Sequence, residues 1–440
     1  VEFSSNSLLQ ALEDYRLIDV KNGSGIRSKN LIYQLRKDKE NCWLFLSHVN
    51  RMENPDLPQR EDYYIRIKGN WELESYDALS GEIEEEKAYH EKGETVLIKT
   101  LYDHDSLLLF LKPASELRSK KGQKTENNKA IIKKSHLNTI CDYHLSEENV
   151  LLLDMAEYKL DNNQWQDREE ILRIDNHYRK QLGYPLRMAA LAQPWLTPEE
   201  EPYHHKLFLR FRIFSEYKAA GLKLALENAA DTKIFLNGEK IKSKPDGWYV
   251  DRSIKTVPLP VLRKGENELL AEIPYNSRTD LEAMYLLGDF GVKVMGSFTK
   301  IVEPVKKMTF GDIRDQGLPF YGGNLTYNLE LELPEGIAKL QASYFRSPLL
   351  KVRLDGEEKG VIAFSPYELS LGEVEAGKHH LEITFFGNRV NTFGTVHNCN
   401  HTETWFGPDA WRTKDEEWSY EYCLKATGIL KAPQIIVEER

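Results

Sequence analysis

The sequence predicts a mainly β protein, built of several antiparallel β-sandwich or jelly-roll domains with few short helices. Leu222, Leu224 and Leu226 alternate with other residues at the period of a half-buried strand. Asn237-Gly238 follows five strand-like residues, and both residue types tolerate the positive φ of a type I′ hairpin turn. Similar turns return at 355–356 and 375–377, so we expect two sandwich domains of similar plan.

Length and composition indicate a multidomain globular protein. A chain of 440 residues has room for about three domains, since one core rarely grows beyond roughly 250 residues. The net charge of −10 argues against a general nucleic-acid binder. The sequence contains no run of 18 apolar residues, so it predicts no membrane-spanning helix. The four cysteines lack CxxC spacing; Cys399 and Cys423 could pair within one domain, but free buried thiols are the favoured interpretation.

Residues 1–113 are predicted to form the first sandwich, which follows a short edge helix. Strands are expected at 31–35, 42–46, 63–68, 71–76, 95–101 and 106–111, a spacing typical of an antiparallel sandwich. The helix at 7–12 has no domain before it, so we expect the chain to be a piece of a longer polypeptide. Residues 114–136 are rich in lysine without interleaved aromatic residues, which favours a solvated linker over a polyanion site.

Residues 137–303 are predicted to form a jelly-roll domain with one helical insertion near 167–183. The run 149–154 is typical of a buried strand, and residues 207–214 alternate again. Between them Ile171, Ile174, Tyr178 and Leu182 recur at helical steps, and Gly183 ends that pattern. A second jelly-roll-like domain is expected at 304–440, whose segment 386–422 is unusually rich in glycine, asparagine, histidine and aromatic residues.

Several short motifs carry a resemblance to glycoside hydrolases. The hairpin Ile234-Phe-Leu-Asn-Gly-Glu239 and the turn Lys264-Gly-Glu-Asn267 resemble the sugar-binding jelly-roll domain of glycoside hydrolase family 2. Other segments resemble large bacterial glycoside hydrolases, notably family 106 α-L-rhamnosidase-like proteins: Asn149-Val-Leu-Leu-Leu-Asp154, Gly288-Asp-Phe-Gly291, Gly317-Leu-Pro-Phe-Tyr-Gly322, Asn391-Thr-Phe-Gly394 and Trp405-Phe-Gly-Pro408.

In such proteins a catalytic (β/α) barrel comes first and β-sandwiches follow. The resemblance therefore implies a galactose-binding-like region that takes part in polysaccharide degradation, with carbohydrate and the preceding barrel of the same polypeptide as partners. No alternation of strands and helices in this chain indicates a barrel, so none of the family's catalytic residues can be carried over.

Catalytic and metal-binding constellations are sparse in this sequence. Glycoside hydrolysis uses two carboxylates roughly 5–9.5 Å apart, for which Glu403 and Asp409 are the best local pair, although turn capping is the favoured interpretation. In an extended strand His397 and His401 would lie about 13 Å apart, too far to share a metal with Cys399, and only a turn could bring the three together. We therefore expect no metal and no cofactor.

Aromatic residues beside polar ones are the strongest functional signal. Sugars present apolar C–H faces and a rim of hydroxyl groups, which exposed rings and polar side chains recognise together. Trp418 and Tyr420 are expected in the core, whereas both core and binding roles stay open for Trp405 and Trp411. The predicted carbohydrate-binding residues are Trp405, Phe406, Trp411, Arg412, His397 and Asn398, and less densely Trp248 and Tyr249.

Three functions follow from these observations. The first is a non-catalytic accessory or carbohydrate-recognition region of a glycoside hydrolase acting on plant or microbial polysaccharide, which shapes the cleft of a barrel absent from this chain. The second is a purely structural module between domains or subunits, without a ligand. The third is a self-sufficient glycosidase that uses Glu403 or Asp409. The sequence predicts neither the subunit number nor the compartment.

Overall fold

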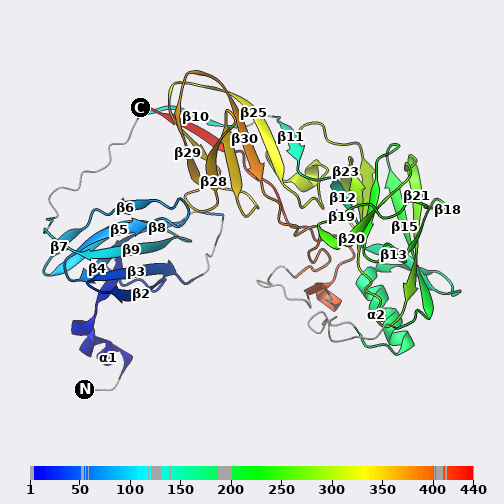
Figure 1. Cartoon of the computed structure of the whole chain (residues 1–440), viewed down its shortest axis with the longest axis horizontal. Helices are drawn as coiled ribbons and strands as arrows, with labels where there is room; N and C mark the ends of the chain where they lie inside the picture. Colours follow the sequence, from blue (N-terminus) through cyan, green and yellow to red (C-terminus); the bar gives the residue numbers. More distant parts are fainter. Residues whose placement is uncertain are drawn as a thin grey trace.

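A computed structural model of the chain confirms the mainly β class. The structure describes residues 4–50, 54, 56–57, 59–116, 118–119, 130–137, 140–186, 201–400, 402, 410–411 and 414–439. Within these residues it contains 31 strands and two α-helices, arranged in three β-rich bodies (Figure 1). Each body has a separate hydrophobic core between its sheets.

The N-terminal body follows helix α1 (Ser5–Ala11) and consists of a four-stranded and a five-stranded antiparallel sheet. Leucine and isoleucine residues at alternate positions of the central strands face inward and form its core. The first sheet, in spatial order, is β1 (Ile18–Asn22), β4 (Arg60–Lys68), β8 (Glu94–Tyr102) and β7 (Tyr89–Glu91). The second is β2 (Leu31–Asp38), β3 (Asn41–His48), β9 (Ser106–Pro113), β5 (Trp71–Tyr76) and β6 (Ile83–Glu85).

The middle body contains the largest core, enclosed by a five-stranded and an eight-stranded sheet. The first sheet, in order, is β12 (Asn149–Leu153), β22 (Met284–Gly288), β16 (Lys223–Leu226), β20 (Asp251–Pro258) and β19 (Trp248–Tyr249). The second is β14 (Gln166–Glu170), β13 (Met155–Leu160), β15 (His205–Ser215), β21 (Gly265–Tyr275), β17 (Lys233–Leu236) and β18 (Glu239–Lys240), extended by β23 (Gly291–Met295) and β24 (Phe298–Val302). Helix α2 (Ile171–Leu182) packs beside β13 and β14.

The C-terminal body also pairs two antiparallel sheets. The first, in order, is β10 (Ile131–His136), β31 (Gln434–Glu438), β26 (Gly336–Gln341) and β29 (Glu368–Val374). The second is β11 (Asp142–Leu145), β25 (Leu325–Leu333), β30 (Gly377–Phe385), β27 (Leu350–Leu354) and β28 (Glu357–Ile362). Between β30 and β31 the chain leaves this body, and residues 393–424 contribute Val396, Phe393 and Tyr422 to the core of the middle body.

The predicted Asn-Gly and Asp-Gly hairpin turns are present, whereas the turn at 375–377 joins β29 to β30, which belong to different sheets. Asn237 and Gly238 have φ values of 52° and 83°, and Asp355 and Gly356 have values of 53° and 81°, as a type I′ turn requires. Each pair joins two neighbouring antiparallel strands, β17 to β18 and β27 to β28. The residue types within each turn and the alternation of the flanking residues are therefore sufficient to predict both hairpins.

Three expectations about the elements are corrected. Residues 131–136 belong to the proposed lysine-rich linker. The structure instead shows them as strand β10, which pairs with β31 of the C-terminal body. Helix α2 begins at Ile171 rather than near 167, since the preceding residues pair with β13 as strand β14. Strand β16 is expected to be half-buried, yet Ala225 is buried as well as Leu224. The neighbouring strand β22 is buried at every position too, so both faces of the sheet are covered here.

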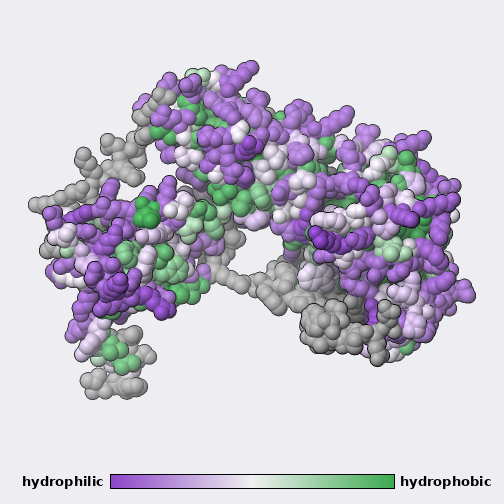
Figure 2. Space-filling model, in the orientation of Figure 1, coloured by the Kyte–Doolittle hydropathy of each residue, from purple (hydrophilic) through white to green (hydrophobic). Residues whose placement is uncertain are grey.

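The surface is mixed in character. Figure 2 shows that polar residues cover most of the visible face, with apolar side chains in patches between them. Neither α-helix in the described part of the chain has the length and apolar character that a bilayer crossing requires.

Candidate functional site

A pocket of about 280 Å³ lies where the C-terminal segment crosses the middle body; we call it the His397 pocket. Four stretches of chain meet there. Asp154 follows β12, Glu170 ends β14, and residues 282–285 lead into β22. The crossing segment supplies residues 392–398, Ala410, Trp411 and Trp418.

Asp154 and His397 form a buried ion pair at the inner end of this pocket. His397 Nε2 donates to Asp154 Oδ2 at 3.1 Å, and His397 Nδ1 donates to the Ser419 carbonyl oxygen at 2.8 Å. Both ring nitrogens therefore face acceptors, as in a protonated imidazole. Burial lowers the pKa of His397, but the hydrogen bond and charge of Asp154 outweigh it, so the pKa is raised.

The position of Asp154 follows from local structure and from one further contact. The five residues of β12 are all buried, so the chain carries the next residue, Asp154, into the interior. The Tyr422 hydroxyl donates to Asp154 Oδ1 at 2.7 Å. With His397 on the other oxygen, both oxygens of this buried carboxylate accept hydrogen bonds, which offsets the cost of burying its charge.

Glu170 is a second buried carboxylate in the lining, and it caps helix α2. Its two oxygens accept hydrogen bonds from the backbone N–H groups of Leu172 and Arg173, each at 3.0 Å. Burial raises the pKa of Glu170 to about 7, with a further contribution from the charge of Asp154, although the capping bonds oppose the shift. Near neutral pH this carboxyl group is therefore partly protonated.

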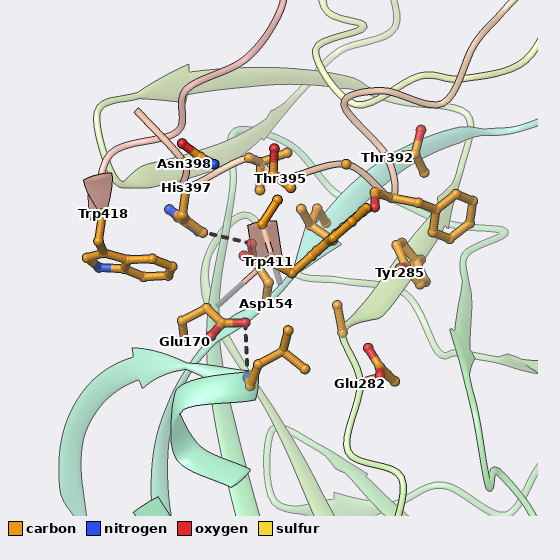
Figure 3. A pocket seen from close by; sticks show the side chains of 17 residues that line it. Asp154, Glu170, Glu282, Tyr285, Thr392, Thr395, His397, Asn398, Trp411 and Trp418 are labelled. Atoms are coloured by element: carbon orange, nitrogen blue, oxygen red, sulfur yellow. Dashed lines mark hydrogen bonds and ion pairs between the residues drawn. The ribbon is translucent and has the colours of Figure 1, made fainter. Parts of the chain in front are cut away.

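Two tryptophan rings lie near the opening of the pocket. Trp411 is 37% exposed, and its Nε1 donates to the Phe393 carbonyl oxygen at 3.0 Å. The half-buried ring of Trp418 packs on His397 with centroids 4.9 Å apart, and the Arg173 guanidinium lies 4.6 Å from its centroid. Figure 3 shows Asp154, Glu170 and His397 gathered together, with Glu282 on the side of Tyr285. The rings are thus held in place before any ligand arrives.

The pocket brings together three of the predicted carbohydrate-binding residues, Trp411, His397 and Asn398. Trp405, Phe406, Arg412, Glu403 and Asp409 lie outside the described residues, and their roles stay predictions. His401, the second histidine of the rejected metal motif, also lies outside them. Within the described part of the chain, no group of three or more potential ligands could hold a metal ion.

The expectation that Trp418 and Tyr420 lie in the core is wrong. Tyr420 is 47% exposed and donates to Glu169 Oε2 at 3.0 Å, while Trp418 lines the pocket. The physical reason is the local backbone, because residues 418–422 form no strand, and the β-bridge between Trp418 and Asn398 is isolated. Their side chains therefore do not alternate between core and solvent.

Trp248 and Tyr249 lie in a different place, which we call the Trp248 pocket. It has a volume of about 810 Å³ and is also lined by Glu147, Glu148 and Arg389. Trp248 is 54% exposed, whereas Tyr249 is buried. Arg389 binds Glu147 through two bonds of 2.6 Å and donates to the Tyr249 hydroxyl at 3.3 Å. The two groups of aromatic residues predicted to bind carbohydrate therefore belong to two separate pockets.

Asp154, Glu170 and Tyr422 are site residues that sequence reasoning missed. Asp154 carried a usable signal, because it directly follows four consecutive apolar strand residues, and aspartate is rarely buried without a partner. Glu170 stands directly before the helical pattern, where a carboxylate can cap the first turn. No signal connected these residues with His397, which lies 243 positions after Asp154.

No family model and no curated protein matches this sequence. Similar solved structures include glycoside hydrolases with a β-rich fold. A rhamnosidase from Novosphingobium sp. PP1Y has a TM-score of 0.42 and 12% identity, over 98% of this chain and 26% of that chain. The α-L-rhamnosidase of Streptomyces avermitilis has a TM-score of 0.23 and 11% identity, over 86% and 31%.

A family 2 β-galacturonidase from Eisenbergiella tayi has a TM-score of 0.18 and 10% identity, over 64% of this chain and 39% of that chain. This chain thus spans between about a quarter and two fifths of the length of these three proteins. Similarity at this level assigns no activity and no ligand to this chain. It places several glycoside hydrolases among the structural neighbours of a multidomain β protein.

Proposed function

We propose that the His397 pocket binds one sugar unit of a carbohydrate, and that the chain is a recognition region of a glycoside hydrolase. The observation that carries this proposal is the combination of Trp411 and Trp418 near the opening with the buried Asp154–His397 pair and Glu170 inside. Aromatic rings pack against the C–H faces of a sugar, and each carboxylate oxygen, which already accepts one hydrogen bond from the protein, has a second lone pair for a sugar hydroxyl group.

The size and rigidity of the pocket support a small ligand. A volume of about 280 Å³ lies just below the range of roughly 300–1,000 Å³ that is usual for drug-sized ligands. The hydrogen bond of the Trp411 indole and the packing of Trp418 against His397 fix both rings. A preformed site loses little conformational entropy on binding, which favours recognition of a weakly apolar molecule such as a sugar.

The same geometry supports an accessory role over catalysis by this chain alone. All four carboxylate oxygens of Asp154 and Glu170 accept hydrogen bonds from the protein, so both groups hold the site together. We propose that bond cleavage belongs to a barrel elsewhere in the parent polypeptide, whose cleft these domains help to shape. Turnover of an aryl glycoside by this chain, lost in Glu403→Gln or Asp409→Asn, would contradict that part.

Isothermal titration calorimetry with rhamnose and galactose tests the binding proposal on the intact chain. We expect saturable binding by the wild type and a loss of more than about tenfold in affinity for Trp411→Ala, because truncation of a tryptophan that packs on a ligand commonly costs over about 2 kcal/mol. Trp248→Ala is the matched control, since Trp248 is exposed but lines the other pocket.

The outcomes are separable. Absence of binding by any neutral sugar to the folded chain overturns the proposal. A loss of affinity in Trp248→Ala, with Trp411→Ala unaffected, moves the site to the Trp248 pocket and rejects the assignment made here. Circular dichroism and urea unfolding of both variants distinguish lost contacts from lost structure.

A further inference from the structure

A third pocket, of about 210 Å³, lies in the middle body and shares Asp154 with the His397 pocket. We call it the Arg168 pocket. Strands β13, β14, β15 and β24 of the eight-stranded sheet supply most of its lining. Three arginines and two carboxylates are among its lining residues: Arg168, Arg210, Arg212, Asp154 and Glu157. Unlike the two other pockets, this one therefore contains several guanidinium groups.

Most of these charged side chains are held by partners in the protein. Glu157 forms ion pairs with Arg210 and, at 3.4 Å, with Arg212. Arg212 also reaches two carboxylates of β21, at 3.0 and 3.2 Å. Both oxygens of Asp154 accept the hydrogen bonds described for the His397 pocket. These carboxylates are thus engaged with their own partners rather than with Arg168.

Arg168 is the exception among the charged lining residues. Its Nη2 donates to the Ser297 carbonyl oxygen at 2.7 Å, and within the described part of the chain it forms no ion pair with a carboxylate. Glu421 lies beside Gly296 in the same turn, yet it is no ion-pair partner of Arg168. A guanidinium carries five N–H donors in a planar fork, so Arg168 keeps donors for a ligand.

An exposed ring stands next to this guanidinium. The Phe298 ring lies with its centroid 5.2 Å from the central carbon of the Arg168 guanidinium, and Phe298 is 64% exposed. Both contacts of Arg168 come from neighbouring residues of one hairpin, Ser297 and Phe298, which fixes the fork relative to the ring. The arrangement suits a molecule that has an oxyanion attached directly to a ring with a C–H face.

We propose that the Arg168 pocket binds the carboxylate of an acidic sugar. The carboxylate would accept two parallel N–H bonds from Arg168, which is the geometry that a guanidinium fork favours, and the sugar ring would pack on Phe298. A volume of about 210 Å³ suits a single sugar unit. The choice of a sugar rests on the proposed role in carbohydrate recognition, but the site is independent of the His397 pocket.

Calorimetry with galactose and galacturonate, which share one ring stereochemistry, tests the need for a carboxylate. The intact chain is used with Trp411→Ala, which removes the proposed binding of sugars in the His397 pocket. Galacturonate should still bind to this variant, at least about tenfold more tightly than galactose, because hydrogen bonds between two charged groups are the stronger ones. High salt should weaken this binding by screening the charge of the partly exposed Arg168.

Substitutions then locate the site. Arg168→Gln should weaken galacturonate binding at least about tenfold, and Arg168→Lys should weaken it too, since lysine keeps the charge but lacks the planar fork. Arg252→Gln is the matched control, because it removes the same charge from an exposed residue that does not line the pocket. Phe298→Ala, at an exposed position, should cost severalfold and keeps the test valid if Arg168→Gln does not fold.

Each remaining outcome decides one of the two proposals. Full affinity in Arg168→Lys, or equal losses in Arg168→Gln and Arg252→Gln, would reject the forked contact. Inorganic phosphate that binds as tightly as galacturonate would reject the sugar and leave a simple anion site. Galacturonate binding that depends on Trp411 but not on Arg168 would reject the Arg168 pocket. If galacturonate binds through Arg168 while no neutral sugar binds the wild type, this inference stands and the proposed function of the His397 pocket fails.

Discussion

The His397 pocket and the Trp248 pocket are both lined by residues of the segment that follows β30, but they differ in the burial of their ion pairs and in volume. In the first, the side chains of the ion pair His397–Asp154 are 5% and 7% exposed. In the second, the side chains of Arg389–Glu147 are 27% and 25% exposed, and the cavity is almost three times as large, about 810 Å³ against 280 Å³. Both pairs join the middle body to the segment that follows β30.

A layer of rings separates the two pockets. Phe393 packs on Tyr285, with centroids 5.1 Å apart, and on Tyr249, with centroids 6.0 Å apart. Tyr285 lines the first pocket and Tyr249 the second. Both pockets are lined by aromatic residues, so aromatic content alone does not distinguish a binding site. The burial of the paired carboxylate is what distinguishes the small His397 pocket from the larger Trp248 pocket.

The largest expected difference comes from removing one carboxylate charge in each pocket. Asp154→Asn should lower the free energy of unfolding by roughly 3 kcal/mol, because it breaks a buried pair and weakens the bonds of His397 and Tyr422. Glu147→Gln, at a partly exposed pair, should cost about 1 kcal/mol or less. Urea unfolding measures both, and equal losses would show that burial does not distinguish the pockets.

The second expected effect is a pH dependence specific to the His397 pocket. The pKa of Glu170 is raised to about 7 from 4.5, so the folded chain holds a proton that the unfolded chain releases. The free energy of unfolding should therefore fall as pH rises from about 4.5 to 7, by roughly 3 kcal/mol in total. Glu170→Gln should lack this fall, and parallel pH profiles of variant and wild type in urea unfolding would contradict the prediction.

His397 adds to the same trend at higher pH. Its pKa is raised, so its stabilising contribution is fully present below the ordinary value of 6.5 and is lost as pH rises through the folded value. In Glu170→Gln, the fall in stability that remains above pH 6.5 should disappear on further replacement of His397 by glutamine. If the free energy of unfolding still fell equally steeply above pH 6.5 in the double variant, groups other than His397 would be responsible for the fall.

The smallest expected effect concerns one hydroxyl group that contacts the ion pair of each pocket. Tyr422→Phe removes a 2.7 Å hydrogen bond to Asp154 and should cost roughly 2 kcal/mol, as is usual for a bond to a charged acceptor. Tyr249→Phe removes only a 3.3 Å contact with Arg389, and should cost well under about 1 kcal/mol. A larger loss for Tyr249→Phe, measured by urea unfolding, would reverse the ranking of the pockets.

Part of the candidate site could be predicted from sequence. The density of aromatic and polar residues at 386–422 indicated Trp411, His397 and Asn398, and all three line the pocket. The expectation failed for Trp418, because strand-like alternation has no meaning where the backbone is irregular. It also missed Asp154, whose importance depends on a partner far away in the sequence.

The sequence by itself determined the mainly β class, most strands of the N-terminal body and two hairpins, one with an Asn-Gly turn and one with an Asp-Gly turn. These features depend on alternation and on φ preferences within a few neighbouring residues, as at Asn237 and Gly238. Only the tertiary structure decided that β10 belongs to the C-terminal body and that Asp154, Glu170 and His397 share one pocket. Long-range pairing and burial set the charge and role of these residues, because desolvation and partner contacts exist only once distant segments have packed together.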